Sequence, residues 1–178
     1  GHDRNVDTIA EIEPFDSVIE GTNGTIDRSE FLGELAPHEK GGDDNLRLGF
    51  VVNGAINNPG DVDVYRFTAD AGTEVWFDID RSTHALDTVV ELITSDGQVL
   101  ARTNNSINEA ADRTLLFRDP SIPDIHVNPL QKSVFDGEDR YTTNPRDAGM
   151  RMVLPGDAGL RGTYFIRVRS VGNDINDL

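Results

Sequence analysis

The sequence contains no cysteine, which excludes disulfide scaffolds, thiolate zinc sites, cysteine nucleophiles and iron–sulfur clusters. It has no apolar run near the roughly 18–20 residues that a membrane-spanning helix needs, so membrane insertion is not expected. Basic residues are also few, since 16 Lys and Arg stand against 32 Asp and Glu, for a formal net charge of −16. Such a surface repels phosphate groups, so nucleic acid is not expected as a partner and a cation is favoured.

The short motifs of common enzyme classes are absent as well. There is no Gly-x-Ser-x-Gly elbow, no His-Glu-x-x-His, no P-loop and no Gly-x-Gly-x-x-Gly. We therefore expect no enzymatic activity and predict no catalytic residue. A hydrolase built from scattered Asp, Glu and His stays open as an alternative. A deep pocket holding two carboxylates about 5–9 Å apart would favour it.

The dominant pattern in the sequence is the alternation of apolar and polar residues with a period of two. Along Thr163–Ser170, for example, Tyr164 and Ile166 alternate with Arg167 and Arg169, which is typical of a half-buried strand. Eight such segments are separated by turn residues: Leu46–Val52, Asp63–Thr68, Glu74–Asp80, Thr88–Thr94, Gln98–Thr103, Thr114–Arg118, Arg151–Leu154 and Thr163–Ser170. Short strands at this spacing predict an all-β fold, an antiparallel β-sandwich of jelly-roll type.

The 178 residues are interpreted as one domain carrying two long insertions. The insertions, about 21–44 and 107–149, lack strand periodicity and are longer than ordinary loops in a compact domain. A single helical turn is expected over Ser29–Leu35, and a tight hairpin is expected around Asp96-Gly97. The abrupt start at Gly1-His2-Asp3 is interpreted as a cut from a longer parent chain.

Two acidic clusters are the best candidates for a metal site. The first contains Glu11, Glu13 and Asp16, and the second places Asp61 and Asp63 in a turn that leads into a strand. Calcium takes six to eight hard oxygen ligands, and carboxylates this close together repel one another unless a cation neutralises them. The alternative is that each cluster is a solvated acidic loop.

Trp76 is the candidate residue for ligand binding. It alternates with Val75 and Phe77, so its ring is predicted to point away from the core. An outward indole can stack on a sugar ring of an extracellular polysaccharide, or it can contact an extracellular protein. The alternative is that one of the insertions covers it, and that interpretation is favoured here because long insertions must pack on something.

Four segments, in order, resemble the bacterial pre-peptidase C-terminal (PPC) domain family. Glu11-Ile-Glu-Pro-Phe-Asp-Ser17 is similar to the family's opening segment, and Gly60-Asp-Val-Asp-Val-Tyr-Arg-Phe67 to its Asp-x-Asp-x-Tyr-x-Phe strand. Leu86–Ala101 is similar to its central hairpin, and Gly162–Val168 to its closing strand. The resemblance covers about half of the chain.

The resemblance implies a non-catalytic accessory module of a secreted or cell-surface bacterial protein. Related collagen-binding domains of clostridial collagenases hold calcium where the N-terminal segment meets the sandwich. By this likeness Glu11, Glu13 and Asp16 would bind the ion together with Asp61 and Asp63, and would join the N-terminal arm to the sandwich. The sequence departs from the pattern at Phe15, where the family has an asparagine, so one oxygen ligand is missing.

Overall fold

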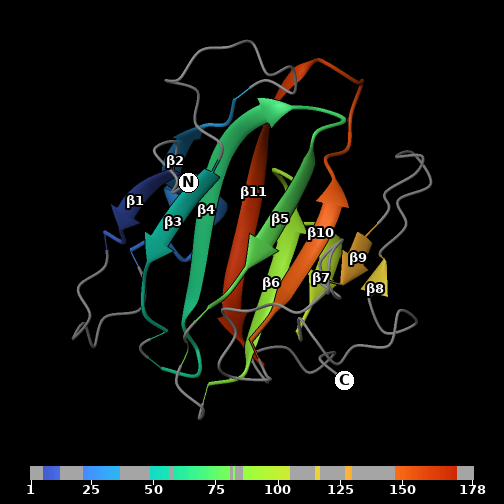
Figure 1. The fold of residues 1–178 in the computed structure, drawn as a ribbon. Coiled ribbons are helices and arrows are strands. Elements are labelled where there is room, and N and C mark those ends of the chain that lie inside the picture. Colours follow the sequence, from blue (N-terminus) through green and yellow to red (C-terminus); the bar gives the residue numbers. More distant parts are fainter. Residues whose placement is uncertain are drawn as a thin grey trace.

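The computed structural model describes residues 6–12, 22–36, 49–56, 58–80, 82, 86–104, 115–116, 127–129 and 147–171. These residues form eleven strands and one short 3-10 helix, in the order β1 Val6–Ala10, η1 Ile26–Arg28, β2 Glu30–Glu34, β3 Gly49–Asn53, β4 Val62–Asp70, β5 Glu74–Asp78, β6 Thr88–Ile93, β7 Val99–Thr103, β8 Leu115–Leu116, β9 Val127–Pro129, β10 Gly149–Val153 and β11 Arg161–Ser170 (Figure 1). The all-β prediction is therefore confirmed. No helix among the described residues has the length and apolarity to cross a membrane.

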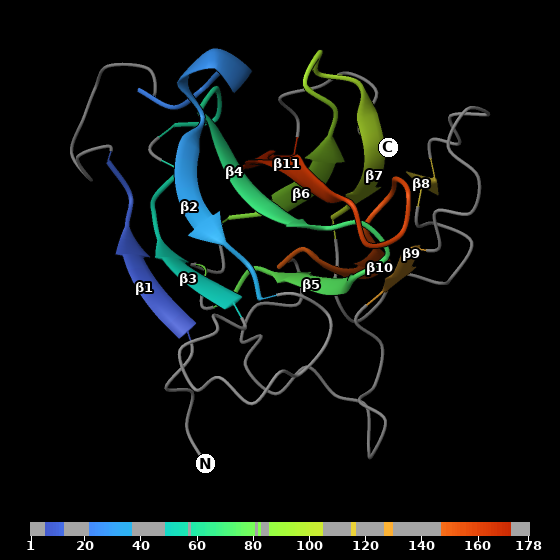
Figure 2. The ribbon, with the colours of Figure 1, turned by 90° about the horizontal axis from the view of Figure 1, so that it is seen from above.

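Three sheets make up the described fold. The largest has six strands in the order β2-β4-β11-β6-β7-β8, the second has three in the order β5-β10-β9, and β1 pairs with β3 alone. Figure 2 shows β5 and β10 forming a layer beneath β4 and β11, with β1 and β3 at the side of β2. The arrangement is sandwich-like, with two layers of strands facing each other.

Alternation along the strands decides which side chains fill the space between these layers. On β4, Phe67 and Ala69 are buried, and on β11 the inward residues are Tyr164 and Ile166. They pack with Val75 of β5, with further core residues Leu92, Met150 and Met152. The Phe67 ring stacks on Tyr164, with ring centroids 5.7 Å apart, so the alternation read from the sequence does define the core.

All eight strands expected from the sequence are present, with bounds shifted by a few residues. The hairpin between β6 and β7 also forms as expected, with the Thr94 amide donating to the Gln98 carbonyl at 2.8 Å. Gly97 adopts φ 86° in its turn, a conformation that residues with a side chain rarely adopt.

The pairing is not antiparallel throughout, because β1 runs parallel to β3 and β2 runs parallel to β4. The helical turn expected over Ser29–Leu35 was also wrong, since this segment is strand β2. Gly33 in its middle has φ 125°, which no α-helix contains. Pairing with the open edge of β4 satisfies backbone groups that a helical turn would leave to water.

Candidate functional site

Glu11, the described member of the first acidic cluster, reaches the main sheet through the small sheet of β1 and β3. These two strands run side by side, and the Glu11 amide continues their ladder by donating to the Asn53 carbonyl at 3.0 Å. Gly54 follows Asn53, and a Cβ there would lie 2.7 Å from Glu11 Oε2. A glycine at this position therefore lets the Glu11 carboxylate approach the backbone closely.

Three donors hold the Glu11 carboxylate in place. Tyr65 Oη donates to Oε1 at 2.6 Å, Asn23 Nδ2 donates to the same oxygen at 3.2 Å, and the Ala55 amide donates to Oε2 at 2.9 Å. Tyr65 lies on β4, 54 residues away from Glu11 in the sequence. A charge-assisted hydrogen bond of this kind contributes about 1.5–3 kcal/mol, so it anchors the N-terminal segment to the sheet.

The second acidic cluster lies at the start of β4, the strand that carries Tyr65, with Asp61 one residue before the strand and Asp63 within it. Asp61, Asp63 and Tyr65 are spaced by two residues, so all three side chains point to the same side. Asp61 is 1% exposed and Asp63 is 2% exposed. Carboxylates this deeply buried need charge or hydrogen-bond compensation, because burial strongly penalises an ionised group.

The pKa values of Tyr65 and Glu30 are both raised, in part by the negative charges around them. Burial raises the pKa of Tyr65 far above its usual range, and the charge of Asp63, the hydrogen bond to Glu11 and the charges of Glu11 and Glu30 raise it further. Burial also raises the pKa of Glu30, opposed by a hydrogen bond from the Ile12 amide and reinforced by the charge of Glu11. The phenol therefore stays protonated as a donor among three carboxylates.

Of the predicted metal ligands, Glu11, Asp61 and Asp63 are described, and Glu13 and Asp16 lie outside the described residues. Within the described parts of the chain, no three acidic or histidine side chains are grouped closely enough to hold a metal ion. The structure thus brings Glu11 and Asp63 to the same phenol, and their binding of an ion stays a prediction.

Asn23 is a residue of this region that the sequence reasoning missed as a ligand. It is 2% exposed, its Nδ2 faces Glu11, and its buried Oδ1 has no hydrogen-bond partner among the described residues. An amide oxygen is a hard ligand of the kind calcium prefers. The oxygens of Glu11, Asp61, Asp63 and Asn23 are therefore of the type that calcium binds, although the structure does not group the three carboxylates closely enough to hold an ion. The Asn23-Gly24 turn marked this position in the sequence, but nothing there linked it to Glu11.

Trp76 lies on the opposite layer, on the outer face of β5. Trp76 is 56% exposed, which confirms the outward orientation. Most residues of the insertions expected to cover it lie outside the described residues. Arg151, its cross-strand neighbour on β10, places its guanidinium 5.7 Å from the ring centroid. Glu74 accepts a long hydrogen bond of 3.4 Å from the indole Nε1. Trp76 thus presents an exposed indole between the charged side chains of Arg151 and Glu74.

The fold and these sites define an all-β module with a buried acidic region and an exposed aromatic residue. Residues 61–129 match the family model of the bacterial pre-peptidase C-terminal domain. The match begins at Asp61 and contains the Tyr65 strand and the central hairpin, so the resemblance read from the sequence is confirmed over this stretch. The Glu11 segment and the closing strand β11 lie outside it. No curated protein and no solved structure matches the chain.

Proposed function

We propose that this chain is a non-catalytic accessory module of a secreted or cell-surface bacterial protein. It would fold as a jelly-roll-type β-sandwich, with a structural calcium ion joining its N-terminal segment to the start of β4. The match of residues 61–129 to an accessory-domain family supports the module assignment. Calcium is present at millimolar levels outside cells, which suits the weak sites of extracellular modules.

One observation carries the calcium part of the proposal. Tyr65 donates a 2.6 Å hydrogen bond to Glu11 while the charge of Asp63 acts on the same phenol. Glu11 and Asp63 thus both act on Tyr65, and a cation would relieve the repulsion between the two carboxylates. Asn23 Oδ1 would add a neutral oxygen, in place of the amide that the family has at Phe15. Glu13 and Asp16 would complete the set from the N-terminal segment.

Calcium is expected to raise the melting temperature of the protein. Free calcium at 100 times its dissociation constant adds about 2.7 kcal/mol to stability, or roughly 5–10 °C for a domain of this size. The measurement is a thermal melt with millimolar calcium against the same melt in EGTA. Magnesium should stabilise less, because it prefers six ligands in octahedral geometry and sheds its water reluctantly.

Two variants make this measurement specific. Asp63→Asn should remove most of the calcium response, whereas Asp157→Asn, in an exposed turn before β11, should keep it. The readout is the difference in midpoint with and without calcium, so a variant that is less stable overall still gives an answer. A wild-type midpoint that is the same in calcium and in EGTA would contradict the calcium site.

A carbohydrate- or protein-binding adhesion module is the second candidate function, and the exposure of Trp76 supports it. An indole that is 56% exposed between Arg151 and Glu74 can stack on a sugar ring while the charged groups bind its hydroxyls. Extracellular polysaccharides are the ligand class that this surface suits best.

Trp76→Ala is expected to abolish binding on a polysaccharide or glycan array. Phe31→Ala is the matched control, because Phe31 is also exposed, at 48%, and also has an arginine, Arg66, over its ring. Equal binding by wild type and Trp76→Ala would show that Trp76 does not bind the glycan.

A further inference from the structure

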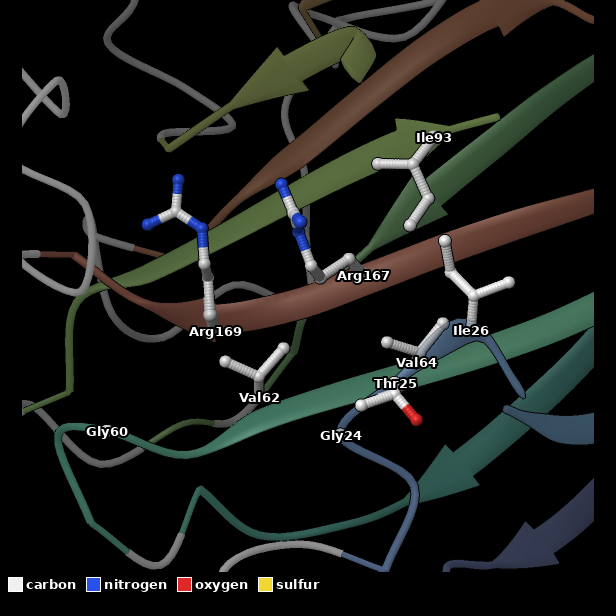
Figure 3. Close-up of a pocket in the computed structure, with 9 residues that line it drawn as sticks. All are labelled: Gly24, Thr25, Ile26, Gly60, Val62, Val64, Ile93, Arg167 and Arg169. Carbon is white, nitrogen blue, oxygen red and sulfur yellow. The ribbon is translucent and has the colours of Figure 1, made fainter. Parts of the chain in front are cut away.

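A cavity of about 480 Å³ opens on the outer face of the six-stranded sheet, the face turned away from the core. It is lined by Gly24, Thr25, Ile26, Gly60, Val62, Val64, Ile93, Arg167 and Arg169 (Figure 3). The cavity lies on the side of the fold opposite to Trp76, whose ring projects from the other layer. Val62 and Val64 also leave β4 on the side opposite to Asp63 and Tyr65, so the cavity is separate from the acidic region as well, although the two adjoin at Asn23-Gly24 and Gly60-Asp61.

The turn before η1 forms one wall of this cavity. The Val64 amide donates to the Asn23 carbonyl at 3.0 Å, which fixes the turn against β4. Ile26 then reaches across toward the β6–β7 turn, where its Cδ1 would lie 3.5 Å from a Cβ placed on Gly97. Val62, Val64 and Ile93 supply the apolar floor between them, as Figure 3 shows.

Arginine side chains form the other wall. Figure 3 shows Arg167 and Arg169 rising side by side from β11 on the same face. Both contact Glu91 of β6, and Arg102 of β7 contacts it from the other side at 2.5 Å. One buried carboxylate is thus shared by three guanidinium groups, which holds their planes in fixed positions.

Arg167 has the geometry to bind a ligand in this cavity. Its Nε donates to Glu91 Oε2, and its two Nη groups carry four further N–H donors. Its side chain is 25% exposed and lines the cavity, whereas Glu91 below it is fully buried. A guanidinium held in this way binds a carboxylate through two parallel hydrogen bonds with little loss of side-chain entropy.

We propose that this cavity binds a small monocarboxylate with an apolar body, its carboxylate on Arg167 and its hydrocarbon part on Val62, Val64 and Ile26. The aliphatic floor suits a hydrocarbon body better than a polar one. The net charge of −16 repels polyanions at a distance, so a ligand with one charge and an apolar body is favoured over phosphate or sulfate.

The test is a titration of the folded chain with 4-methylpentanoate at low salt, followed by ¹H–¹⁵N NMR. The amides of Gly24 and Gly60 lie at the cavity, so their shifts are expected to move and saturate. The uncharged isostere 4-methylpentanamide should bind at least tenfold more weakly, and so should sulfate. This comparison uses the wild-type protein and does not depend on any variant folding.

Two variants complete the experiment. Arg167→Gln should weaken 4-methylpentanoate binding at least tenfold. Arg161→Gln, which removes an exposed arginine bound to Glu34 and Asp70 elsewhere on the sheet, should leave it unchanged. Equal affinity for the acid and the amide would overturn the proposal, as would equal affinity for sulfate or shifts that leave Gly24 and Gly60 unmoved.

Discussion

Replacing Glu91 with glutamine is expected to lower the free energy of unfolding by about 3–5 kcal/mol at neutral pH. Glu91 is 0% exposed and contacts Arg102, Arg167 and Arg169 from its two carboxylate oxygens. Glutamine keeps the shape but removes the charge, and its NH₂ group would face an arginine donor. Removing one member of a buried ion pair costs this much because the remaining charges stay buried without it.

The stability of the wild type should also depend on pH through the charge of Glu91. Burial alone would raise the pKa of Glu91, but the hydrogen bonds and charges of Arg169 and Arg167 outweigh it and lower the pKa below 4.5, the value of a free glutamate. A lowered folded pKa stabilises the protein above pH 4.5, and this contribution disappears as the pH falls from there through the folded pKa. The difference in unfolding free energy between wild type and Glu91→Gln should therefore shrink on acidification.

Urea unfolding at pH 7 and at acidic pH measures both effects. Glu34→Gln is the control, since Glu34 is 69% exposed and its ion pair with Arg161 should contribute about 0–1 kcal/mol. A Glu91→Gln protein as stable as the wild type at pH 7 would mean that the cluster does not hold this face of the sheet together.

Replacing Phe67 with alanine is expected to cost about 3–5 kcal/mol as well. The ring is 3% exposed and lies between two others, with centroids 5.7 Å from Tyr164 and 6.1 Å from Phe77. Alanine would leave a cavity between the two layers, where β4, β5 and β11 meet. The loss combines the transfer free energy of the ring with the contacts that the surrounding side chains forfeit.

The measurement is again equilibrium unfolding in urea, with Phe31→Ala as the matched control. Phe31 is 48% exposed, and its contact with the Arg66 guanidinium should be worth about 0.5–1 kcal/mol. Similar losses for the two phenylalanines would indicate that Phe67 is not part of a tightly packed core.

The fold could be predicted from the sequence wherever a strand has one buried side. Along β11, Tyr164 and Ile166 face the core while Arg167 and Arg169 face outward, as the alternation indicates. Strands β1, β2 and β9 were not predicted, because they are edge segments whose existence depends on a partner. In and just after β2, the apolar residues Phe31, Leu32 and Leu35 follow a helical spacing, but Gly33 and the open edge of β4 made the segment a strand.

The candidate site could be predicted only in part. The composition of the acidic clusters identified Glu11, Asp61 and Asp63. The contacts of Glu11 with Tyr65, 54 residues away, and with Asn23, 12 residues away, depend on the tertiary structure. Asn23 in particular is a common turn residue in the sequence, and its role beside Glu11 exists only because β1 carries Glu11 to β4.

The sequence by itself determined the all-strand class, the inward and outward faces of most strands, and the excess of negative charge, because these follow from local alternation and composition. The tertiary structure decided which residues of different strands face one another. Arg167, Glu91 and Arg102 share one row because of the register of β11, β6 and β7, which no local pattern specifies. Buried charges are compensated, and cavities are lined, by residues that neighbouring strands place opposite one another. The candidate sites therefore depend on strand register.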